Sequence, residues 1–386
     1  MSASTLRMPP TALADRLRQW RDRLQASPRF RRLAAAFPLT RPIARRRARA
    51  LFDLCAGFTY TQTLLACVRL DLFEILNERP RTLAELAQHL SLTEAATVRL
   101  LDAAISLQLA ERRRNQRFGL GPLGCAMIGN AGIAAMVEHH AALYADLRDP
   151  VALLRGARPG ALSGYWPYAE VAHPLQLEAA QTDSYTTLMA ASQSFIAEEV
   201  LAAYDFRRHR CLLDIGGGDG SFLAAVARQA PAIDLMLLDL PAVADRARRR
   251  FAAEGLAARA IGGDAIAAAL PVGADIVSFV RVLHDHDDAA VLSMLRGARD
   301  ALPPHGTLLI AEPMADTPGA EPIAGAYFGF YFLAMGQGRC RTPHALRQLL
   351  GQAGFDRVRL LPTRLPMLAR VLIAHSAKHG TAVTLD

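Results

Sequence analysis

The sequence predicts an α/β protein in which a mainly helical domain precedes a doubly wound sheet of seven strands. Three observations support this prediction. Short apolar runs alternate with amphipathic helical patterns over residues 201–375, as in a mostly parallel sheet covered by helices. Residues 51–200 have helical periodicity almost throughout. A turn with four glycines in five positions, Gly216 to Gly220, follows the first apolar run.

The first 50 residues differ from the rest of the chain in charge. By composition the 386 residues form a basic arm (1–50), a helical domain (51–200) and a sheet domain (201–386). The arm has 13 arginines and two aspartates, a net charge of +11, whereas the remainder has a net charge of −3. Leu13, Leu17, Trp20 and Leu24 recur at helical spacing among the arginines. This helix either packs on its own domain or a second copy, or lies on an anionic membrane.

Within the helical domain, residues 82–124 predict a helix-turn-helix with a wing. A helix over 82–89 is followed by a second helix that begins at Thr93, whose hydroxyl can cap its first turn. The run AERRRNQRFGL then predicts two short strands around a polar tip. Such modules often read DNA, but Arg99 is the sole basic residue of the second helix, and groove reading needs several basic or amide side chains. We therefore expect packing or dimerisation, not nucleic-acid binding.

Seven apolar runs predict the strands of the sheet domain. They are residues 211–216, 235–240, 258–264, 275–284, 307–313, 357–362 and 368–375. We expect an amphipathic helix between each of the first five strands, which makes that part of the sheet parallel. The last two runs are close together in sequence, with TRLPM between them, so we expect them to pair antiparallel.

The bulk composition excludes several classes of protein. The chain is 52% hydrophobic and 21% charged, as is usual for a soluble globular protein. The apolar run 325–336 is shorter than the about 20 residues that span a bilayer, and the first 25 residues lack the apolar core of a signal peptide. Five scattered cysteines fit reduced thiols in the cytoplasm, and no cysteine pair or histidine tract has the spacing of metal ligands, so we expect no metal.

The glycine turn indicates a ligand that approaches the backbone. A strand, a glycine turn and a helix together form the binding corner of nucleotide folds. The dinucleotide pattern G-x-G-x-x-G is absent, because Ser221 stands where a third glycine is required. The turn instead reads D-x-G-x-G-x-G, with Asp214, Gly216, Gly217, Gly218 and Gly220. The acid disfavours a pyrophosphate, so a cationic nucleoside such as S-adenosylmethionine fits better.

Two further acids stand at strand ends and support this cofactor. Asp239 ends the second strand 19 residues after the turn, where an acid commonly accepts both ribose hydroxyls. Asp264 ends the third strand and is placed for the adenine amino group. Each acid could alternatively cap a turn; with the glycine pattern in the same sheet, we interpret both as cofactor residues. We expect the adjoining Leu240 and Ala265, and Arg281 in the fourth run, to contact the same ligand.

These motifs carry a family resemblance. LLDIGGGDG, LDLP, GD, VLHDHDD and IAEP occur in order and at suitable spacing. From about residue 50 the chain resembles the caffeate-type and acetylserotonin-type O-methyltransferases. The resemblance implies a Rossmann-like class I methyltransferase domain, S-adenosylmethionine as cofactor, and a winged-helix domain that forms a homodimer.

The same resemblance points to the catalytic residues. His284, at the end of the fourth run, corresponds to the general base that takes the proton of the substrate hydroxyl. Its rival is His286, where the family usually has tryptophan. Glu312 matches the acid that orients the base from the neighbouring strand. A second family acid is replaced by Cys340, so the two-acid support of the base is incomplete.

Aromatic and apolar residues are expected to line the substrate site. They come from residues 164–169, 184–199 and 326–342, and include Trp166, Tyr168, Phe328, Tyr331, Phe332 and Met335. About half of them would simply be core. The polar groups expected for a dihydroxyphenol or a carboxylated ring are missing, which favours a long hydrocarbon substrate.

Within the family, the runs SGYWPYA and YFLAMGQGRCRT resemble the carotenoid O-methyltransferases of purple bacteria, the hydroxyneurosporene (demethylspheroidene) type. This resemblance implies methylation of the tertiary 1-hydroxyl of an acyclic carotenoid. It also gives the basic arm a purpose, peripheral contact of a cytoplasmic enzyme with the inner or photosynthetic membrane. Two alternatives stay open: methylation of a bacteriochlorophyll precursor or a small phenol, and a winged-helix regulator with a degenerate methyltransferase body.

Overall fold

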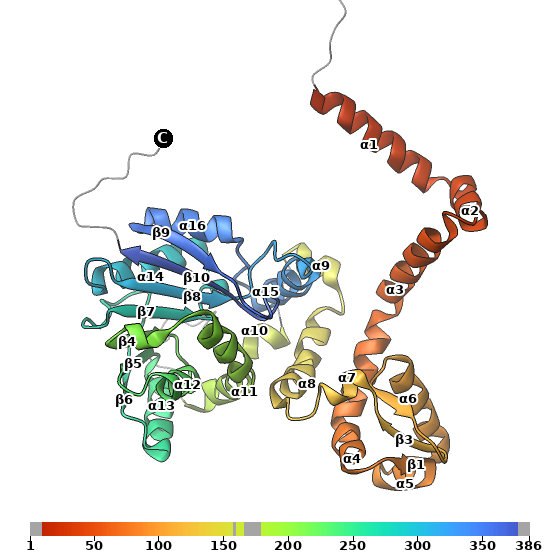
Figure 1. Cartoon of the computed structure of the whole chain (residues 1–386), viewed down its shortest axis with the longest axis horizontal. Coiled ribbons are helices and arrows are strands. Elements are labelled where there is room, and N and C mark those ends of the chain that lie inside the picture. Colours follow the sequence, from red (N-terminus) through yellow and green to blue (C-terminus); the bar gives the residue numbers. More distant parts are fainter. Residues whose placement is uncertain (1–9, 157–159, 166–178, 377–386) are drawn as a thin grey trace, which may run out of the picture. The chain divides into compact units, whose positions relative to one another are not determined.

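The computed structural model describes residues 10–156, 160–165 and 179–376. The chain forms two compact units, Met1–Cys125 and Ala126–Asp386 (Figure 1). The sequence predicts a boundary near residue 200, where the composition changes. In the structure, the second unit begins at Ala126, before that position, and includes the sheet.

The first unit is mainly helical. Its described elements are α1 (Pro10–Ala26), α2 (Pro28–Ala36), α3 (Arg41–Arg69), α4 (Leu72–Glu78), β1 (Arg81–Thr82), α5 (Leu83–His89), α6 (Glu94–Ser106), β2 (Ala110–Arg112), β3 (Arg117–Leu120) and α7 (Pro122–Cys125). By length and apolar composition, α3 alone among the described helices could cross a membrane, and 6% of its apolar window is buried. Core helices of soluble proteins and signal sequences meet the same criteria, so this finding is weak evidence for a membrane span.

The winged helix predicted for residues 82–124 is present. Strand β1 precedes helices α5 and α6, strands β2 and β3 follow them, and the three strands form a small antiparallel sheet in the order β1-β3-β2. The Thr93 hydroxyl accepts a hydrogen bond from the Ala96 N–H at 3.2 Å and caps α6, as expected.

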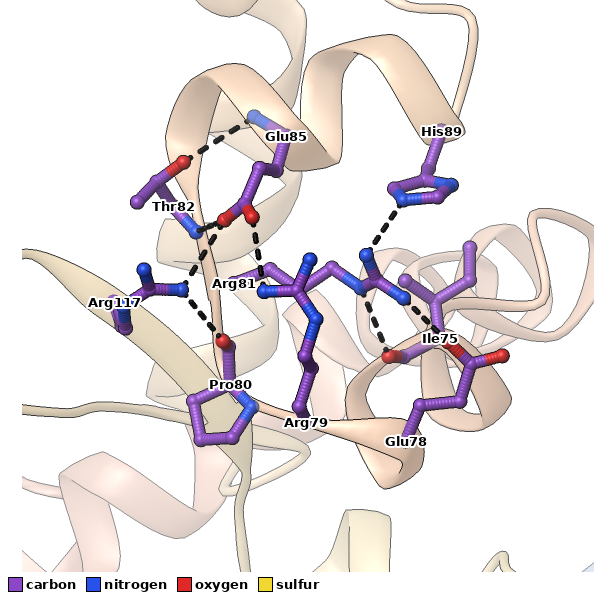
Figure 2. A network of polar contacts seen from close by, with 9 residues as sticks. All are labelled: Ile75, Glu78, Arg79, Pro80, Arg81, Thr82, Glu85, His89 and Arg117. Carbon is purple, nitrogen blue, oxygen red and sulfur yellow. Dashed lines mark hydrogen bonds and ion pairs between the residues drawn. The ribbon is translucent and has the colours of Figure 1, made fainter.

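Figure 2 shows a polar network where β1 passes into α5. Thr82 and Glu85 form a capping box, in which the Thr82 N–H donates to Glu85 Oε2 at 2.7 Å and the Glu85 N–H donates to Thr82 Oγ1 at 3.3 Å. Arg79 and Arg117 pair with the same carboxylate at 2.9 and 3.3 Å. The Thr82 main-chain bond and then Arg79 lower the pKa of Glu85 to about 2.

A buried arginine extends this network to α4 (Figure 2). The Arg81 side chain forms an ion pair with Glu78, donates to the Ile75 carbonyl at 3.4 Å, and places Nη1 2.7 Å from His89 Nε2. Because Arg81 is 6% exposed, these contacts replace its hydration and join α4 to α5.

The second unit contains the large sheet. Its described helices are α8 (Ala131–Asp146), α9 (Pro150–Leu154), α10 (Ala161–Tyr165), α11 (Ala179–Ala203), α12 (Ser221–Gln229), α13 (Pro241–Glu254), α14 (Asp288–Ala301), α15 (Gly329–Met335) and α16 (Pro343–Gln352), with the 3-10 turns η2 (Phe206–Arg208) and η3 (Leu283–Asp285) and the π-helix η4 (Ile323–Phe328). Its strands are β4 (Cys211–Ile215), β5 (Asp234–Asp239), β6 (Ala258–Gly262), β7 (Ile276–Val280), β8 (Thr307–Glu312), β9 (Phe355–Leu361) and β10 (Arg370–Ser376).

The sheet confirms the predicted fold class. All seven predicted strands are present, in the spatial order β6-β5-β4-β7-β8-β10-β9. The first five pair in parallel, and β10 lies antiparallel between β8 and β9. The order reverses between β5 and β7 around β4, so the carboxyl end of β4 is the switch point where such sheets bind ligands.

One expected helix is absent from the described residues. The connection from β6 to β7, residues 263–275, consists of turns and irregular chain. Gly263, Pro271 and Gly273 interrupt any helical run in this short segment. The prediction of a helix between every pair of the first five strands is therefore wrong at this connection.

Alternate strand residues fill two cores. Leu213 and Ile215 of β4 belong to one buried cluster, together with helices α14 and α16, whereas Leu212 belongs to the other, with α12 and α13. Asp214 shares the face of Leu212 because side chains alternate along a strand. A carboxyl therefore stands in the apolar interior, directly before the glycine turn.

Candidate active site

A cavity of about 210 Å³ lies at the carboxyl ends of β4, β5 and β7. It is lined by all the predicted cofactor residues except Gly220, namely Asp214, Gly216, Gly217, Gly218, Asp239, Leu240, Asp264, Ala265 and Arg281. Thr186, Met189, Ala190 and Gln193 of α11 close one side of it. These residues lie in the segment 184–199, which the sequence predicts as lining of the substrate site rather than as part of the cofactor site.

The turn needs glycine for two reasons: neighbouring atoms leave no room for a Cβ at some positions, and other positions have a positive φ. A Cβ on Gly217 would lie 2.6 Å from Asp214 Oδ2, and one on Gly220 would lie 2.2 Å from the Phe251 ring. Gly216 and Gly218 have φ of +67° and +60°, values that favour glycine. A Cβ on Gly218 would meet no atom within 4 Å, so this part of the turn faces open space beside the cavity. Gly220 thus serves the packing of the turn onto α13, and Gly218 leaves room for a ligand.

Asp214 is a buried acid under the turn. It is 1% exposed, accepts a hydrogen bond from the Ser278 hydroxyl at 2.6 Å through Oδ1, and has no partner for Oδ2. The strand register explains the contact, since Asp214 stands opposite Ser278 on β7. Burial raises the pKa of Asp214 to about 7. An unpartnered buried carboxyl oxygen in the cavity lining is complementary to a cationic ligand.

Asp239 is held in a fixed orientation at the end of β5. Its Oδ2 accepts from the Gly218 N–H at 2.8 Å and its Oδ1 accepts from the Leu240 N–H at 2.7 Å. Each oxygen retains a lone pair for a further donor. Burial raises the pKa of Asp239 to about 6. Asp264 accepts from the Ile266 N–H at 2.8 Å, so it caps a turn and lines the cavity at the same time.

Arg281 has a backbone conformation that is rare for its residue type. Its φ is +59°, immediately after β7 ends at Val280. The guanidinium donates to the Ser192 hydroxyl at 2.8 Å and lies 2.7 Å from Met189 Sδ, both on α11. Arg281 therefore links the end of the fourth strand to the helix that borders the cavity.

His284 lies beyond the strand, in the 3-10 turn Leu283–Asp285, four residues after β7 ends. The prediction that it ends the strand is corrected by this turn. Its Nε2 is 3.1 Å from Asp285 Oδ1, while Nδ1 is buried without a hydrogen-bond partner. Burial by itself would lower the pKa of His284, but the charges of Asp285 and Glu312 outweigh it and the pKa is raised. His286 lines the cofactor cavity, and burial lowers its pKa.

Glu312 contacts the main chain of the histidine turn. The His284 N–H donates to Glu312 Oε2 at 3.0 Å, and Oε1 has no partner. Burial raises the pKa of this fully buried acid. The acid on the His284 ring is Asp285, which the sequence analysis did not single out although it directly follows His284. Glu312 sits on the neighbouring strand end as expected, but with the turn rather than the ring as its hydrogen-bond partner.

The segment Gly338–Arg341 holds the histidine turn from the other side. Arg341 is 1% exposed and donates to the carbonyls of Leu283 and His286, both at 2.7 Å, and to Asp288 Oδ1 at 2.8 Å. The Arg339 N–H donates to the His284 carbonyl at 2.7 Å.

Gly338 and Cys340 complete this segment. Gly338 has φ of +92°, and a Cβ there would lie 2.6 Å from the His284 carbonyl oxygen. Burial raises the pKa of the Cys340 thiol to about 12, so the position of the second family acid carries no charge.

An aromatic wall stands beside His284. The Phe328 and Phe332 rings stack at 5.5 Å with an interplanar angle of 19°, and their centroids lie 6.1 and 5.3 Å from that of His284. Tyr331, Phe332 and Met335 are buried in a cluster with residues of α8, α9 and α10. Trp166 and Tyr168, predicted for the same lining, lie outside the described residues.

Two histidines of α8 fix this wall. His139 Nε2 and the Tyr331 hydroxyl are 2.9 Å apart, as are His140 Nε2 and the Tyr327 hydroxyl. Burial lowers the pKa of His139 to about 4 and raises that of Tyr327 to about 12, so both are neutral near pH 7. Sequence reasoning missed these pairs because 192 and 187 residues separate the partners.

Comparison with known proteins places the chain in a family. The O-methyltransferase domain matches residues 146–356, and the O-methyltransferase dimerisation domain matches residues 52–129. Demethylspheroidene O-methyltransferase of Cereibacter sphaeroides is 40% identical over 356 residues, which cover 91% of this chain and 93% of that protein. Acetylserotonin O-methyltransferase of Mus musculus molossinus is 32% identical over 82% of this chain and 86% of that protein.

Solved structures agree. The S-adenosylmethionine-dependent methyltransferase SibL is 25% identical with a TM-score of 0.72, over 85% of this chain and 99% of that chain. Human N-acetylserotonin methyltransferase, solved in complex with S-adenosylmethionine, shares the fold with a TM-score of 0.71 at 23% identity, over 86% of this chain and 98% of that chain. The chain therefore belongs to the S-adenosylmethionine-dependent O-methyltransferases that have an N-terminal dimerisation domain.

Proposed function

We propose that this protein transfers a methyl group from S-adenosylmethionine to the tertiary 1-hydroxyl of an acyclic carotenoid. The observation that carries the proposal is the position of His284, whose ring lies against the stacked Phe328 and Phe332 rings. An apolar, aromatic wall beside the base suits a polyene alcohol better than a charged phenol. The 40% identity with a demethylspheroidene O-methyltransferase supports the same substrate class.

The cavity residues suit the cofactor. S-adenosylmethionine, when bound, supplies an electrophilic methyl group on a sulfonium. Asp239 has lone pairs available for the ribose hydroxyls, and Asp264 can accept from the adenine amino group. The buried acid Asp214 favours the positive charge of the ligand through the low-dielectric interior. Gly218 keeps the approach to the backbone open.

His284 is the proposed general base. When its Nε2–H donates to Asp285, Nδ1 carries a lone pair, and this buried atom has no partner. It can accept the proton of the substrate hydroxyl. A tertiary alcohol is very weakly acidic, so proton removal must accompany attack by the oxygen. The neighbouring charges of Asp285 and Glu312 stabilise the imidazolium that forms.

His284→Ala tests the base. We expect S-adenosylmethionine affinity to be retained and kcat to fall by about 10²–10⁴-fold, the usual contribution of a positioned base. His286→Ala is the matched control, because His286 is the neighbouring imidazole of the same loop, and it should lose much less turnover. Near-normal kcat in His284→Ala would assign the base elsewhere.

Product analysis tests the substrate. Purified protein is incubated with S-adenosylmethionine and, separately, with detergent-dispersed 1-hydroxycarotenoids, bacteriochlorophyllides and simple phenols. We expect a methyl ether of the carotenoid. Turnover of a tetrapyrrole or a phenol without turnover of the carotenoid would overturn the substrate assignment and leave the cofactor assignment intact.

We further propose that the protein is a homodimer. The dimerisation family matches residues 52–129, and the matched part of α3 exposes Phe52 at 66%, Leu54 at 81% and Phe58 at 68%. Burial of such a face against a second copy removes apolar surface from water. Sedimentation equilibrium should give about twice the chain mass, and Leu54→Glu with Phe58→Glu should shift it toward the monomer. A monomeric parent protein at micromolar concentration would contradict the proposal.

A further inference from the structure

The N-terminal arm exposes large apolar side chains over its whole length. In α1, Leu13 and Leu17 are 60% exposed and Trp20 is 64% exposed. Helix α2 has no buried residue, and Leu33 on it is 68% exposed. The arm, defined here as Pro10–Arg49, thus has apolar surface that its own unit does not cover.

In α1 this surface forms one stripe. Successive residues of an α-helix are rotated by roughly 100°, so residues at intervals of three and four share a face. Leu13, Leu17, Trp20 and Leu24 meet this spacing and lie on one side of α1. Leu24 is half-buried, and the other three project into solvent.

Arginines border the apolar stripe on both sides, and no acid of α1 borders it. The same geometry places Arg16 and Arg23 along one edge of the stripe and Arg21 along the other edge. Asp15 and Asp22 lie on the opposite face of the helix together with Arg18. Arg18 pairs with Asp15 at 3.1 Å, and Arg21 reaches Asp22 at 2.8 Å. Arginines beside the apolar stripe and acids remote from it are typical of a helix that lies in a membrane interface.

The arm as a whole is complementary to an anionic surface. Its 12 arginines against two aspartates contrast with the slightly acidic part of the chain that follows the arm. Arginine is the cation best suited to phosphate, since its guanidinium donates two parallel hydrogen bonds.

We propose that the arm binds the surface of an anionic lipid membrane, with the α1 stripe at the headgroup boundary and the bordering arginines on lipid phosphates. The biological reason for this binding rests on the proposed function, because an enzyme at the membrane can reach a substrate that is dissolved in it. The binding itself rests on the arm alone. The protein is then a cytoplasmic enzyme held peripherally at the membrane.

Two other binding partners for the arm, a second copy of the chain and duplex DNA, are less well supported. The dimerisation match begins at residue 52, after the arm, so a second copy is expected on the later part of α3. Duplex DNA attracts arginine but has no counterpart for an exposed leucine and tryptophan stripe, because groove-reading helices present polar side chains to the bases.

Vesicle co-sedimentation of the full chain tests the proposal. We expect binding to vesicles of equal parts phosphatidylcholine and phosphatidylglycerol, weak binding to pure phosphatidylcholine, and loss of binding as salt is raised. The variant R16Q/R21Q/R23Q, which removes the three bordering arginines, should lower the partition constant by roughly 100-fold. The matched control D15N/D22N, which alters the remote face, should bind at least as well as the parent.

A second variant separates insertion from charge attraction. Leu17→Gln with Trp20→Gln keeps all arginines and should still weaken binding, because the apolar stripe is lost. Equal binding of the parent to neutral vesicles, or unchanged binding of both variants, would overturn the proposal, as would tighter binding to duplex DNA than to vesicles. All variants should methylate detergent-dispersed substrate at the parent rate, so failure here is distinguishable from failure of the proposed function.

Discussion

At the scale of single residues, the site depends on the pKa of His284, on which burial and neighbouring charges act in opposite directions. Burial disfavours its charged form, while Asp285 at 3.1 Å and the nearby Glu312 favour it. The net result is a raised pKa, which strengthens the base and lowers the fraction that is neutral at low pH.

Asp285→Asn tests this balance. Removing the carboxylate leaves burial as the larger influence, so the pKa of His284 should fall and the acidic limb of the kcat/KM profile against pH should move to lower pH. The maximal rate should also fall, since a less basic imidazole accepts the proton less readily. A purely structural role for Asp285 would reduce the rate without moving this limb, and that outcome would contradict the assignment.

At the scale of elements, the histidine turn lies outside the regular helices and strands, and Glu312 of β8 bonds its main chain at His284. Its carbonyls are held by the segment Gly338–Arg341, through the buried Arg341 guanidinium and the Arg339 main chain. This arrangement fixes the position of the base relative to the sheet. The winged helix relies on a similar device, because the buried Arg81 joins α4 to α5 (Figure 2).

Arg341→Lys should therefore impair catalysis as a positioning defect. One ammonium cannot replace a guanidinium that bonds two carbonyls and a carboxylate, and a base displaced by about 1 Å can cost roughly 100-fold in rate. We expect kcat to fall while S-adenosylmethionine affinity changes little. Arg339→Lys is the matched control: its side chain is 59% exposed and its bond to the turn comes from the main chain. Equal losses in both variants would argue against the positioning role.

At the scale of the whole molecule, the cofactor acids link stability to pH. Burial raises the pKa of Asp214 to about 7 and that of Asp239 to about 6, from an ordinary value of 3.8. The protonated forms are thus favoured by the fold. Their contribution to stability is present below pH about 4 and is lost as pH rises through these folded-state values.

Thermal unfolding at several pH values tests this linkage. The Tm of the protein without cofactor should fall between pH 5 and 8, and the rise in Tm on adding S-adenosylmethionine should be larger at pH 8, because the cation favours the ionised acids. Asp239→Asn should reduce both effects. A rise in Tm that is the same at all pH values would show that these acids do not titrate with binding.

The sequence by itself determined the seven strands, the winged helix, the glycine turn and the acids at strand ends. Each depends on local pattern: alternation of apolar residues, a capping threonine, or glycine where a side chain has no room. The cofactor family followed from these features, since strand ends of a parallel sheet converge on one edge.

The tertiary structure alone decided what surrounds the base. Asp285 rather than Glu312 meets the His284 ring, Arg341 holds the Leu283 carbonyl from 58 residues away, and His139 meets Tyr331 across 192 residues. The last two pairings leave no local pattern, because residues distant in sequence become neighbours only when the elements that carry them pack. The connection before β7 has no helix among the described residues, although the alternation of strands and helices predicted one. Gly263, Pro271 and Gly273 disfavour a helix in this short segment.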